Sequence, residues 1–309
     1  MTAIGRPSER LRNGNVSPSE PYTYGRAAGD DENRAEAKMK AVIQCGGKGT
    51  RLRPYTMILP KPLMPVGSRP VLELLLKWLR RNDAREIYIT TGYLGHLIRS
   101  FCGDGHQWDT RITYTEESEP LGTIGPLSLL RNELHETFMV LNGDVLTDLS
   151  LGAFAAYHQQ HGALVTVATT TRKTKMDFGI VEQGNGRITH FREKPVYSHL
   201  VSMGIYCMEP EVLDYIPQGL PFGFDDLILC LLSRGLPVFT FGHNGMWMDI
   251  GRVEDFQNAQ ELAWDDQAPA FEIVDANGAD VRDHPAMHNG GGGERHAAFD
   301  MAVHGHPAA

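Results

Sequence analysis

The alternation of strand-like and helix-like segments between residues 39 and 265 most strongly constrains the fold of this 309-residue chain. A short apolar stretch at 40–44 is followed by a stretch at 70–81 whose leucines recur at helical spacing. Repeated alternation of this kind is typical of βαβ units, in which helices cover both faces of a mostly parallel sheet. The sequence therefore predicts an α/β domain with a mixed, mostly parallel sheet.

The other elements can be placed from the same patterns. After residue 175 the strands become shorter, which predicts a small sheet region inserted into the domain. Ser150 is expected to cap the helix that follows it, and Asp225 and Asp226 are expected to cap another. Further strands are expected at 86–90, 111–114, 138–141, 164–169, 179–182, 188–191 and 201–208, and further helices at 94–101, 125–134, 150–161, 224–234 and 252–264.

Two flanking segments differ in composition from the domain between them. Residues 1–38 are rich in Ser, Pro, Gly, Asn and Arg and lack an apolar period, which predicts a disordered N-terminal arm. Residues 266–309 contain four consecutive glycines and five of the thirteen histidines. Because the histidine spacing fits no metal-ligand template, we expect a mostly disordered, solvated tail, with one strand-like piece at 271–274.

The composition excludes several classes of protein. The net charge of −9 argues against a nucleic-acid-binding face, which would be basic. No apolar run approaches the roughly 18–20 residues of a membrane span, and the N-terminal residues lack the apolar stretch of a secretory signal. The four cysteines are widely spaced and form no CxxC pair, as is typical of a reduced, cytoplasmic protein. The composition does not decide whether the chain forms a homo-oligomer, so that possibility is kept.

A glycine-rich turn, Gly46-Gly-Lys-Gly-Thr-Arg51, follows the first expected strand. Glycines at this place in an α/β sheet let backbone N–H groups approach phosphate oxygens. Two common templates do not fit, since Gly49 stands where a P-loop needs Ser or Thr and Leu52 stands where a dinucleotide fingerprint needs its third glycine. Thr50 and Arg51 beside the glycines nevertheless favour a triphosphate site.

A proline-rich loop follows, with the sequence Leu59-Pro-Lys-Pro-Leu-Met-Pro65, and its Lys61 lies ten residues after Arg51. Its three prolines restrict the backbone, so Lys61 is presented at a low cost in conformational entropy. We therefore expect this lysine to be held in place rather than to extend freely into solvent.

Two aspartates, Asp144 and Asp249, directly follow apolar strand-like segments. Although distant in sequence, they could meet at one edge of the sheet and hold Mg²⁺, which proteins bind through a few carboxylates and substrate phosphates. A bound cation would neutralise the anionic groups that phosphoryl chemistry brings together. The string Asn142-Gly-Asp144 alone is more typical of a turn, and Asp104, between two glycines, is interpreted as a turn residue.

Together these motifs resemble the signature of the sugar-1-phosphate nucleotidylyltransferases. The strings GGKGTRLRP and LPKPLMPV are most similar to those of bacterial mannose-1-phosphate and heptose-1-phosphate guanylyltransferases, and the resemblance covers most of residues 39–265. It implies a Rossmann-like nucleotidyltransferase fold. It also implies a reaction in which an NTP and a sugar-1-phosphate give an NDP-sugar and pyrophosphate.

The resemblance also implies roles for individual residues. In the family the glycine turn lies against the nucleotide, an arginine holds the departing pyrophosphate and the aspartates bind the metal ion. Its EKP motif, here Glu193-Lys194-Pro195, binds the hydroxyls and the phosphate of the sugar. The implied set is catalytic for Arg51, Lys61, Asp144 and Asp249; nucleotide-binding for Gly46, Gly47, Gly49, Thr50, Arg51, Lys61, Gly122, Thr123 and Asp144; sugar-phosphate-binding for Gly179, Glu193, Lys194, Ser202 and Asp249; and metal-binding for Asp144 and Asp249.

The substrates are less sharply implied than the reaction. The string EESEPLGTIG around Gly122 and Thr123 resembles the guanylyltransferase loop EPLGTAG and favours GTP, with ATP, UTP, CTP and dTTP left open. Many relatives carry Asn-Ala or Asn-Thr where this chain has Ser202-Met203. The change argues against plain mannose or glucose and leaves room for a heptose. We expect a mannose- or heptose-like sugar, and a cyclitol phosphate of secondary metabolism is the alternative.

Two other functions are compatible with a sheet of this kind. Regulatory subunits of the family bind nucleotide sugars without turnover, but they usually lack some of the charged residues that this chain retains. A glycosyltransferase would need an Asp-x-Asp motif, and Asn142 stands where its first aspartate would be.

Overall fold

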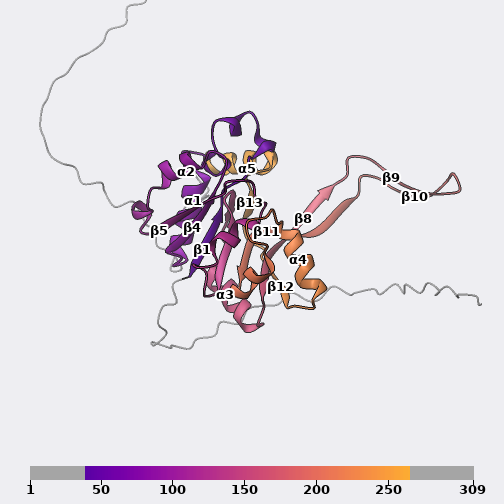
Figure 1. The fold of residues 1–309 in the computed structure, drawn as a ribbon. Coiled ribbons are helices and arrows are strands. Elements are labelled where there is room, and N and C mark those ends of the chain that lie inside the picture. The colour runs from indigo at the N-terminus through magenta and orange to yellow at the C-terminus, as the bar shows by residue number, and fades with distance from the viewer. Residues whose placement is uncertain (1–38, 265–309) are drawn as a thin grey trace, which may run out of the picture. The chain divides into compact units, whose positions relative to one another are not determined.

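The computed structural model describes residues 39–264, so the predicted tails and the strand-like piece at 271–274 lie outside the described residues. Its centre is a seven-stranded sheet (Figure 1). Only β11 runs antiparallel to its neighbours, and the other four pairings are parallel, which confirms the predicted fold class. The strand order is β12 (Val238–Gly242), β8 (Val165–Lys175), β11 (Val196–Met208), β6 (Phe138–Asn142), β1 (Lys40–Gln44), β4 (Glu86–Thr91) and β5 (Arg111–Glu116).

Helices cover both faces of this sheet, and β1 shows why. Its side chains alternate, so Ala41 and Ile43 point into one core and Val42 points into the other. The first core is closed by α1 (Val71–Arg81), α2 (Gly95–Cys102) and α3 (Leu151–Gln160), and the second by α4 (Phe224–Ser233). The predicted cap at Ser150 is confirmed, since its Oγ accepts from Ala153 N–H. The caps predicted at Asp225 and Asp226 are wrong in position, because α4 already begins at Phe224 with Gly223 as its N-cap, and Asp226 accepts from Gly223 N–H from within the first turn.

The expected helix at 125–134 is wrong. The chain instead forms a short 3-10 helix, η5 (Gly125–Leu130). Its hydrogen bonds span three residues rather than four, as from Leu127 N–H to Ile124 O, and the preceding N–H groups of Ile124 and Gly125 bond to Phe222 O. Leu127 and Leu130 are buried as the apolar spacing suggested, so the spacing identified the buried side chains but not the type or the length of the helix.

A smaller unit lies beside the carboxyl ends of the sheet strands. The short strands β7 (Val145–Thr147) and β13 (Trp247–Asp249) pair antiparallel, and α5 (Val253–Trp264) follows. Leu146, Ile250 and Ala259 form a third apolar cluster, which includes Val66 of the short strand β2 (Pro65–Val66), paired with β3 (Arg69–Pro70). This cluster fixes β13 and α5 against the loop that carries Lys61.

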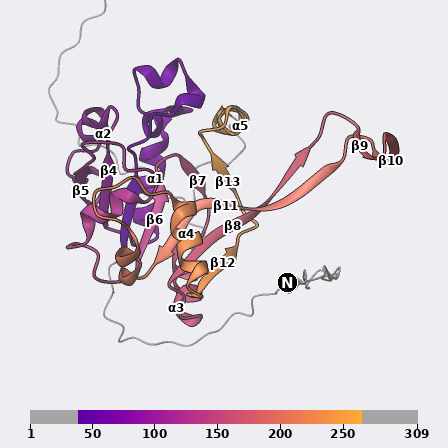
Figure 2. The same ribbon diagram turned by 45° about the vertical axis from the view of Figure 1, so that its right-hand side comes forward.

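The inserted region forms an arm that extends from the sheet (Figures 1 and 2). Strands β8 and β11 continue as a two-stranded ribbon from Thr170–Val201 to Lys175–Val196, and β9 (Ile180–Gly184) pairs with β10 (Arg187–Arg192) at the tip. Large apolar side chains along the arm are exposed, for example Phe178 at 75%. The arm is longer than predicted, because β8 ends at Lys175 and β11 begins at Val196.

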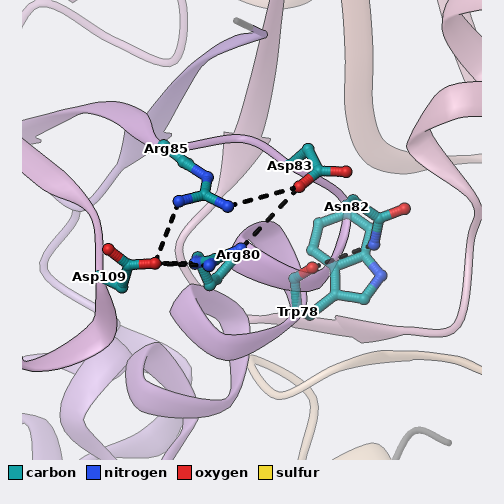
Figure 3. A network of polar contacts seen from close by, with 6 residues as sticks. All are labelled: Trp78, Arg80, Asn82, Asp83, Arg85 and Asp109. Atoms are coloured by element: carbon teal, nitrogen blue, oxygen red, sulfur yellow. Dashed lines mark hydrogen bonds and ion pairs between the residues drawn. The ribbon is translucent and has the colours of Figure 1, made fainter. Parts of the chain in front are cut away.

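A polar network ties the end of α1 to the amino ends of β4 and β5 (Figure 3). Asp109 accepts hydrogen bonds from Arg80 and Arg85, and the hydrogen bonds to Arg80 lower the pKa of the Asp109 carboxyl. Asn82 Nδ2 donates to Trp78 O, which closes the last turn of the helix.

Among the described residues, no helix combines the length and apolarity that a bilayer crossing requires.

Candidate active site

The two predicted metal-binding aspartates lie side by side although they come from different strands. Asp144 occupies the turn between β6 and β7, and Asp249 ends β13, opposite Val145 in the antiparallel register. A hydrogen bond from Ile250 N–H to Asp144 O, 2.9 Å long, joins the two segments. The Asp144 side chain is 13% exposed and that of Asp249 is 24% exposed, so both carboxylates are largely shielded from water.

Lys61 lies between these carboxylates. Its Nζ forms an ion pair with Asp144 Oδ2 and lies 3.5 Å from Asp249 Oδ1. The proline-rich loop forms a 3-10 turn, Lys61–Leu63, and holds the lysine side chain at 14% exposure. Burial lowers the pKa of Lys61, an effect that Asp249 opposes and the positive charge of Arg51 reinforces. The prediction that this lysine is held in place is confirmed.

The donor set suits a magnesium ion that also binds substrate. Both carboxylates reach one ammonium group, so they also reach a common point that a small cation could occupy. In the part of the chain that the structure describes, no group of three or more His, Cys, Asp or Glu side chains forms a complete cation cage. Two carboxylates plus phosphate oxygens are a usual Mg²⁺ site, and the residues present therefore fit such an ion.

The glycine-rich turn lies beside this charged group. Gly49 has a left-handed backbone (φ 58°), and a Cβ there would lie 3.2 Å from Lys61 Cβ, so glycine permits the two loops to pack. Thr56 Oγ1 donates to Gly49 O at 2.8 Å and holds the turn in place. Thr50 and Arg51 follow it in a short 3-10 turn and are exposed. The turn thus brings the predicted triphosphate residues next to the lysine.

Glu117 was not predicted, but its carboxylate lies over the glycine turn. A side chain at position 46 would overlap Glu117 Oε1, and Oε2 accepts a 2.9 Å hydrogen bond from Leu121 N–H. Partial burial raises the pKa of Glu117, and the bond to Leu121 partly offsets that effect. The sequence signal was available, because Glu117 belongs to the string EESEPLGTIG.

The loop with Gly122 and Thr123 packs against the segment before α4. Gly122 has a φ of 80°, and a Cβ there would lie 2.8 Å from Phe222 O. Thr123 Oγ1 accepts from Phe224 N–H at 2.8 Å. Both residues are therefore fixed by backbone contacts, close in sequence to Glu117.

The predicted sugar residues fall into two groups. Ser202 lies at a bulge of β11, where its Oγ accepts from Gly204 N–H at 3.2 Å. Gly204 has a φ of 72°, and a side chain there would overlap Asn142, at the end of β6. Ser202 thus lies near the edge of the sheet that leads to Asp144.

Gly179, Glu193 and Lys194 form the second group, on the arm. A Cβ on Gly179 would lie 3.1 Å from Glu193 Oε2, and Lys194 Nζ lies 3.9 Å from Glu193 Oε1. Both charged side chains are more than half exposed. Within residues 39–264, neither hydrogen bonds nor ion pairs connect them with Asp144 or Asp249. The structure brings these three residues together but leaves them on an arm that points away from β13 in both views (Figures 1 and 2).

Comparison with known proteins adds to this geometry. The family profile described as Nucleotidyl transferase matches residues 40–265. A UTP–glucose-1-phosphate uridylyltransferase of Synechocystis is 36% identical over 241 residues, covering 72% of this chain and 62% of that protein. A mannose-1-phosphate guanyltransferase of Schizosaccharomyces pombe is 34% identical over 227 residues, covering 71% and 62%. The chain thus spans about 62% of the length of these relatives.

Solved structures agree on the fold. One, from Bacillus anthracis and assigned as a glucose-1-phosphate thymidylyltransferase, has 26% identity and a TM-score of 0.60, over 75% of this chain and 98% of that one. HddC from Yersinia pseudotuberculosis, at 23% identity and a TM-score of 0.58, covers 72% of this chain and 98% of its own. At that identity the second likeness concerns the fold alone.

Proposed function

The chain belongs to the nucleotidyl transferase family, and on that premise we propose that it joins an NTP to a sugar-1-phosphate to give an NDP-sugar and pyrophosphate. The observation that carries the proposal is the convergence of Lys61, Asp144 and Asp249 beside a glycine-rich turn. The names of the two sequence relatives support the same reaction type.

In this reaction a sugar phosphate oxygen attacks the α-phosphorus of the NTP, and the bond to pyrophosphate breaks. The sugar phosphate is already an anion at neutral pH, so the site needs no general base. Positioning and neutralisation of charge dominate such reactions. Backbone N–H groups of the glycine turn would bind the triphosphate, Arg51 would hold the departing pyrophosphate, and Lys61 would bind a phosphate oxygen.

We propose Mg²⁺ as the metal ion, held by Asp144 and Asp249. When bound, it would neutralise charge on the reacting phosphates. Lys61 Nζ contacts both carboxylates in the structure, and its ammonium would then turn toward the phosphate. We propose a cytoplasmic location as well, which the four free cysteines support, since thiols stay reduced in that compartment.

GTP is the nucleotide that we favour. Guanine presents two neighbouring donors, N1–H and the 2-amino group, and a carboxylate can accept from both. Glu117 offers such a carboxylate over the glycine turn, on the loop that leads to Gly122 and Thr123. Adenine has no matching pair of donors, and ionised glutamate has no donor for the carbonyl groups of uracil or thymine.

The proposed sugar site requires the arm to approach the aspartates. Glu193 would accept from sugar hydroxyls, Lys194 would bind the sugar phosphate, and Gly179 would line the pocket beside Glu193. Ser202, with its short hydroxyl side chain next to buried Met203, leaves room for a heptose-like sugar or a cyclitol. Mannose-1-phosphate stays a candidate because of the guanyltransferase relative.

A substrate matrix tests the proposal. Five NTPs are combined with mannose-, glucose-, heptose- and cyclitol phosphates, and each mixture is assayed for pyrophosphate release and product mass. We expect pyrophosphate in equal amount to one NDP-sugar, with GTP the best nucleotide. Binding of a nucleotide sugar without any pyrophosphate would instead identify a regulatory subunit. Sugar transfer to an acceptor without pyrophosphate would identify a glycosyltransferase.

A further inference from the structure

Asp255 is a buried carboxylate that the proposed reaction does not use. It lies in the first turn of α5 and is 3% exposed. Both of its oxygens are occupied: Oδ2 accepts from Asp249 N–H at 3.1 Å and from Arg172 Nη1 at 2.8 Å, and Oδ1 forms an ion pair with Arg172 Nη2. A buried carboxylate is tolerated only when it is paired and hydrogen-bonded in this way.

The guanidinium of Arg172 is itself held from two directions. It meets the Asp255 carboxylate through two parallel hydrogen bonds, and it lies over the Trp247 ring with 5.2 Å between Cζ and the ring centroid. Trp247 is fixed in turn, because its Nε1 donates to Met203 O at 2.8 Å. Arg172 belongs to β8 at the base of the arm, paired with His199 of β11.

These contacts determine where Asp249 lies. Its backbone N–H is held by Asp255, and its Oδ1 accepts from Gly251 N–H at 2.9 Å and lies 3.5 Å from Lys61 Nζ. Strand β13 has three residues and one partner strand, so its ladder alone gives it little support. The hydrogen bond from Asp249 to Asp255 is therefore a main constraint on the end of this strand.

We propose that Asp255 is a positioning residue for Asp249, and that Arg172 fixes Asp255 in the orientation this requires. The inference rests on the proposed function, since it takes Asp249 as a metal ligand. It connects the base of the arm, which carries the proposed sugar residues, with the strand that carries the metal ligand. Partners that orient ligands in this way typically change metal affinity or activity by about ten- to a hundredfold when they are replaced.

Asp255→Asn tests the pair, because the amide keeps the shape of the side chain but loses the charge that Arg172 requires. We expect the half-saturating Mg²⁺ concentration to rise about tenfold or more and kcat to fall, with KM for the NTP nearly unchanged. Mn²⁺ binding gives a readout without turnover, and the EPR signal of the free ion measures it. We expect the affinity for Mn²⁺ to fall by a similar factor, so more of the ion stays free and its signal is larger. Glu254→Gln makes the same charge change at the neighbouring, 80% exposed position and should leave both measurements unchanged.

Arg172→Lys is the second variant, for the case that Asp255→Asn does not fold. It keeps the positive charge but loses the planar fork, so we expect the same direction of change. A lower melting temperature with unaltered Mg²⁺ dependence and Mn²⁺ affinity in the folded variants would mean that the pair only supports the fold, and would overturn the inference.

Asp249→Asn, measured in parallel, separates this inference from the proposed function. If that variant loses metal dependence while the Asp255 and Arg172 variants do not, only the positioning role fails. If the wild-type protein shows neither turnover nor Mn²⁺ binding, the proposed function fails and the inference fails with it.

Discussion

Lys61 Nζ lies 3.5 Å from Asp249 Oδ1, although the two residues are 188 positions apart in the sequence. The contact joins the proline-rich loop to the end of β13, and the ion pair of Lys61 with Asp144 joins both to β6. Three segments that are far apart in the chain thus place one cation between two carboxylates. The proposed chemistry depends on this arrangement. A metal ion would take the place of the Lys61 ammonium between the two carboxylates, and a substrate phosphate would take the place of the carboxylates as the partner of Lys61.

Asp144→Asn and Asp249→Asn should each lower kcat by orders of magnitude. The amide keeps the size of the side chain but is a much weaker ligand for a hard cation, so the charge of the reacting phosphates is less well neutralised. Steady-state pyrophosphate release at saturating Mg²⁺ measures the effect, and thermal unfolding monitors the fold. Asp104→Asn is the control, since the Asp104 carboxylate accepts from His106 N–H in an exposed turn. If Asp144→Asn or Asp249→Asn kept activity within a few-fold of wild type, the substituted aspartate would not be a ligand of the metal ion.

Lys194→Ala should raise KM for the sugar phosphate by about ten- to a hundredfold. A charge-assisted hydrogen bond to a phosphate contributes about 1.5–3 kcal/mol to binding. KM for the NTP should stay nearly constant, whereas Lys61→Ala should impair NTP use or kcat first. Lys175→Ala is the control, as Lys175 is another exposed lysine of the arm. An unchanged KM, or an equal rise for both substrates, would show that Lys194 does not bind the sugar phosphate.

Gly46→Ala should destabilise the protein, and Gly47→Ala should not. A Cβ at position 46 would overlap the Glu117 carboxylate, so the carboxylate must move and lose its bond to Leu121 N–H. That loss costs about 0.5–1.5 kcal/mol in the free energy of unfolding. A Cβ at position 47 has no atom within 4 Å. Urea unfolding of both variants measures the difference.

The overlap between a side chain at position 46 and the Glu117 carboxylate can be tested by removing that carboxylate. In a Glu117→Ala background the overlap is absent, so Gly46→Ala should then cost much less than in the wild-type protein. An equal cost in both backgrounds would mean that Glu117 does not lie over the glycine turn.

The parts of the fold that the sequence predicted are those with a local signal. Strand β1 and helix α1 have an unbroken apolar pattern, and both occur where that pattern places them. Strand β12 was missed although its sequence, VFTFG, is rich in β-branched and aromatic residues, so that local signal was overlooked. The arm was underestimated because residues from Thr170 onward carry no alternating apolar pattern. The helix expected at 125–134 forms only as a 3-10 helix over Gly125–Leu130, because apolar spacing does not separate the two kinds of helix over so short a segment.

The same distinction applies to the site. Lys61, Asp144 and Asp249 were found because a proline-rich loop and strand ends mark them locally. Asp255 was not, because an acid in the first turn of a helix is favourable there in any protein and carries no special signal. Only the structure shows that its carboxylate bonds to Asp249 N–H and to Arg172.

The stability of the protein should fall with pH below about 6.5 because of His158. This histidine is fully buried, with Nδ1 2.8 Å from Thr166 Oγ1 and Nε2 3.1 Å from Glu209 Oε1. Burial lowers its pKa from the ordinary value of 6.5, and Glu209 opposes part of that effect. Between 6.5 and the lowered pKa, the unfolded chain binds more protons than the folded one. The free energy of unfolding therefore decreases as pH falls through this window, by about 1.4 kcal/mol for each unit of pKa difference.

His158→Gln tests this assignment, since the amide keeps a donor and an acceptor but does not titrate. Urea unfolding at pH 7.5 and 5.5 should show a smaller difference between the two pH values in this variant than in the wild-type protein. His161→Gln is the control, because His161 is exposed at the end of the same helix, and it should retain the wild-type difference. Equal differences in the wild-type protein and in His158→Gln would place the acid sensitivity elsewhere, because only a group whose pKa changes on folding can contribute to it.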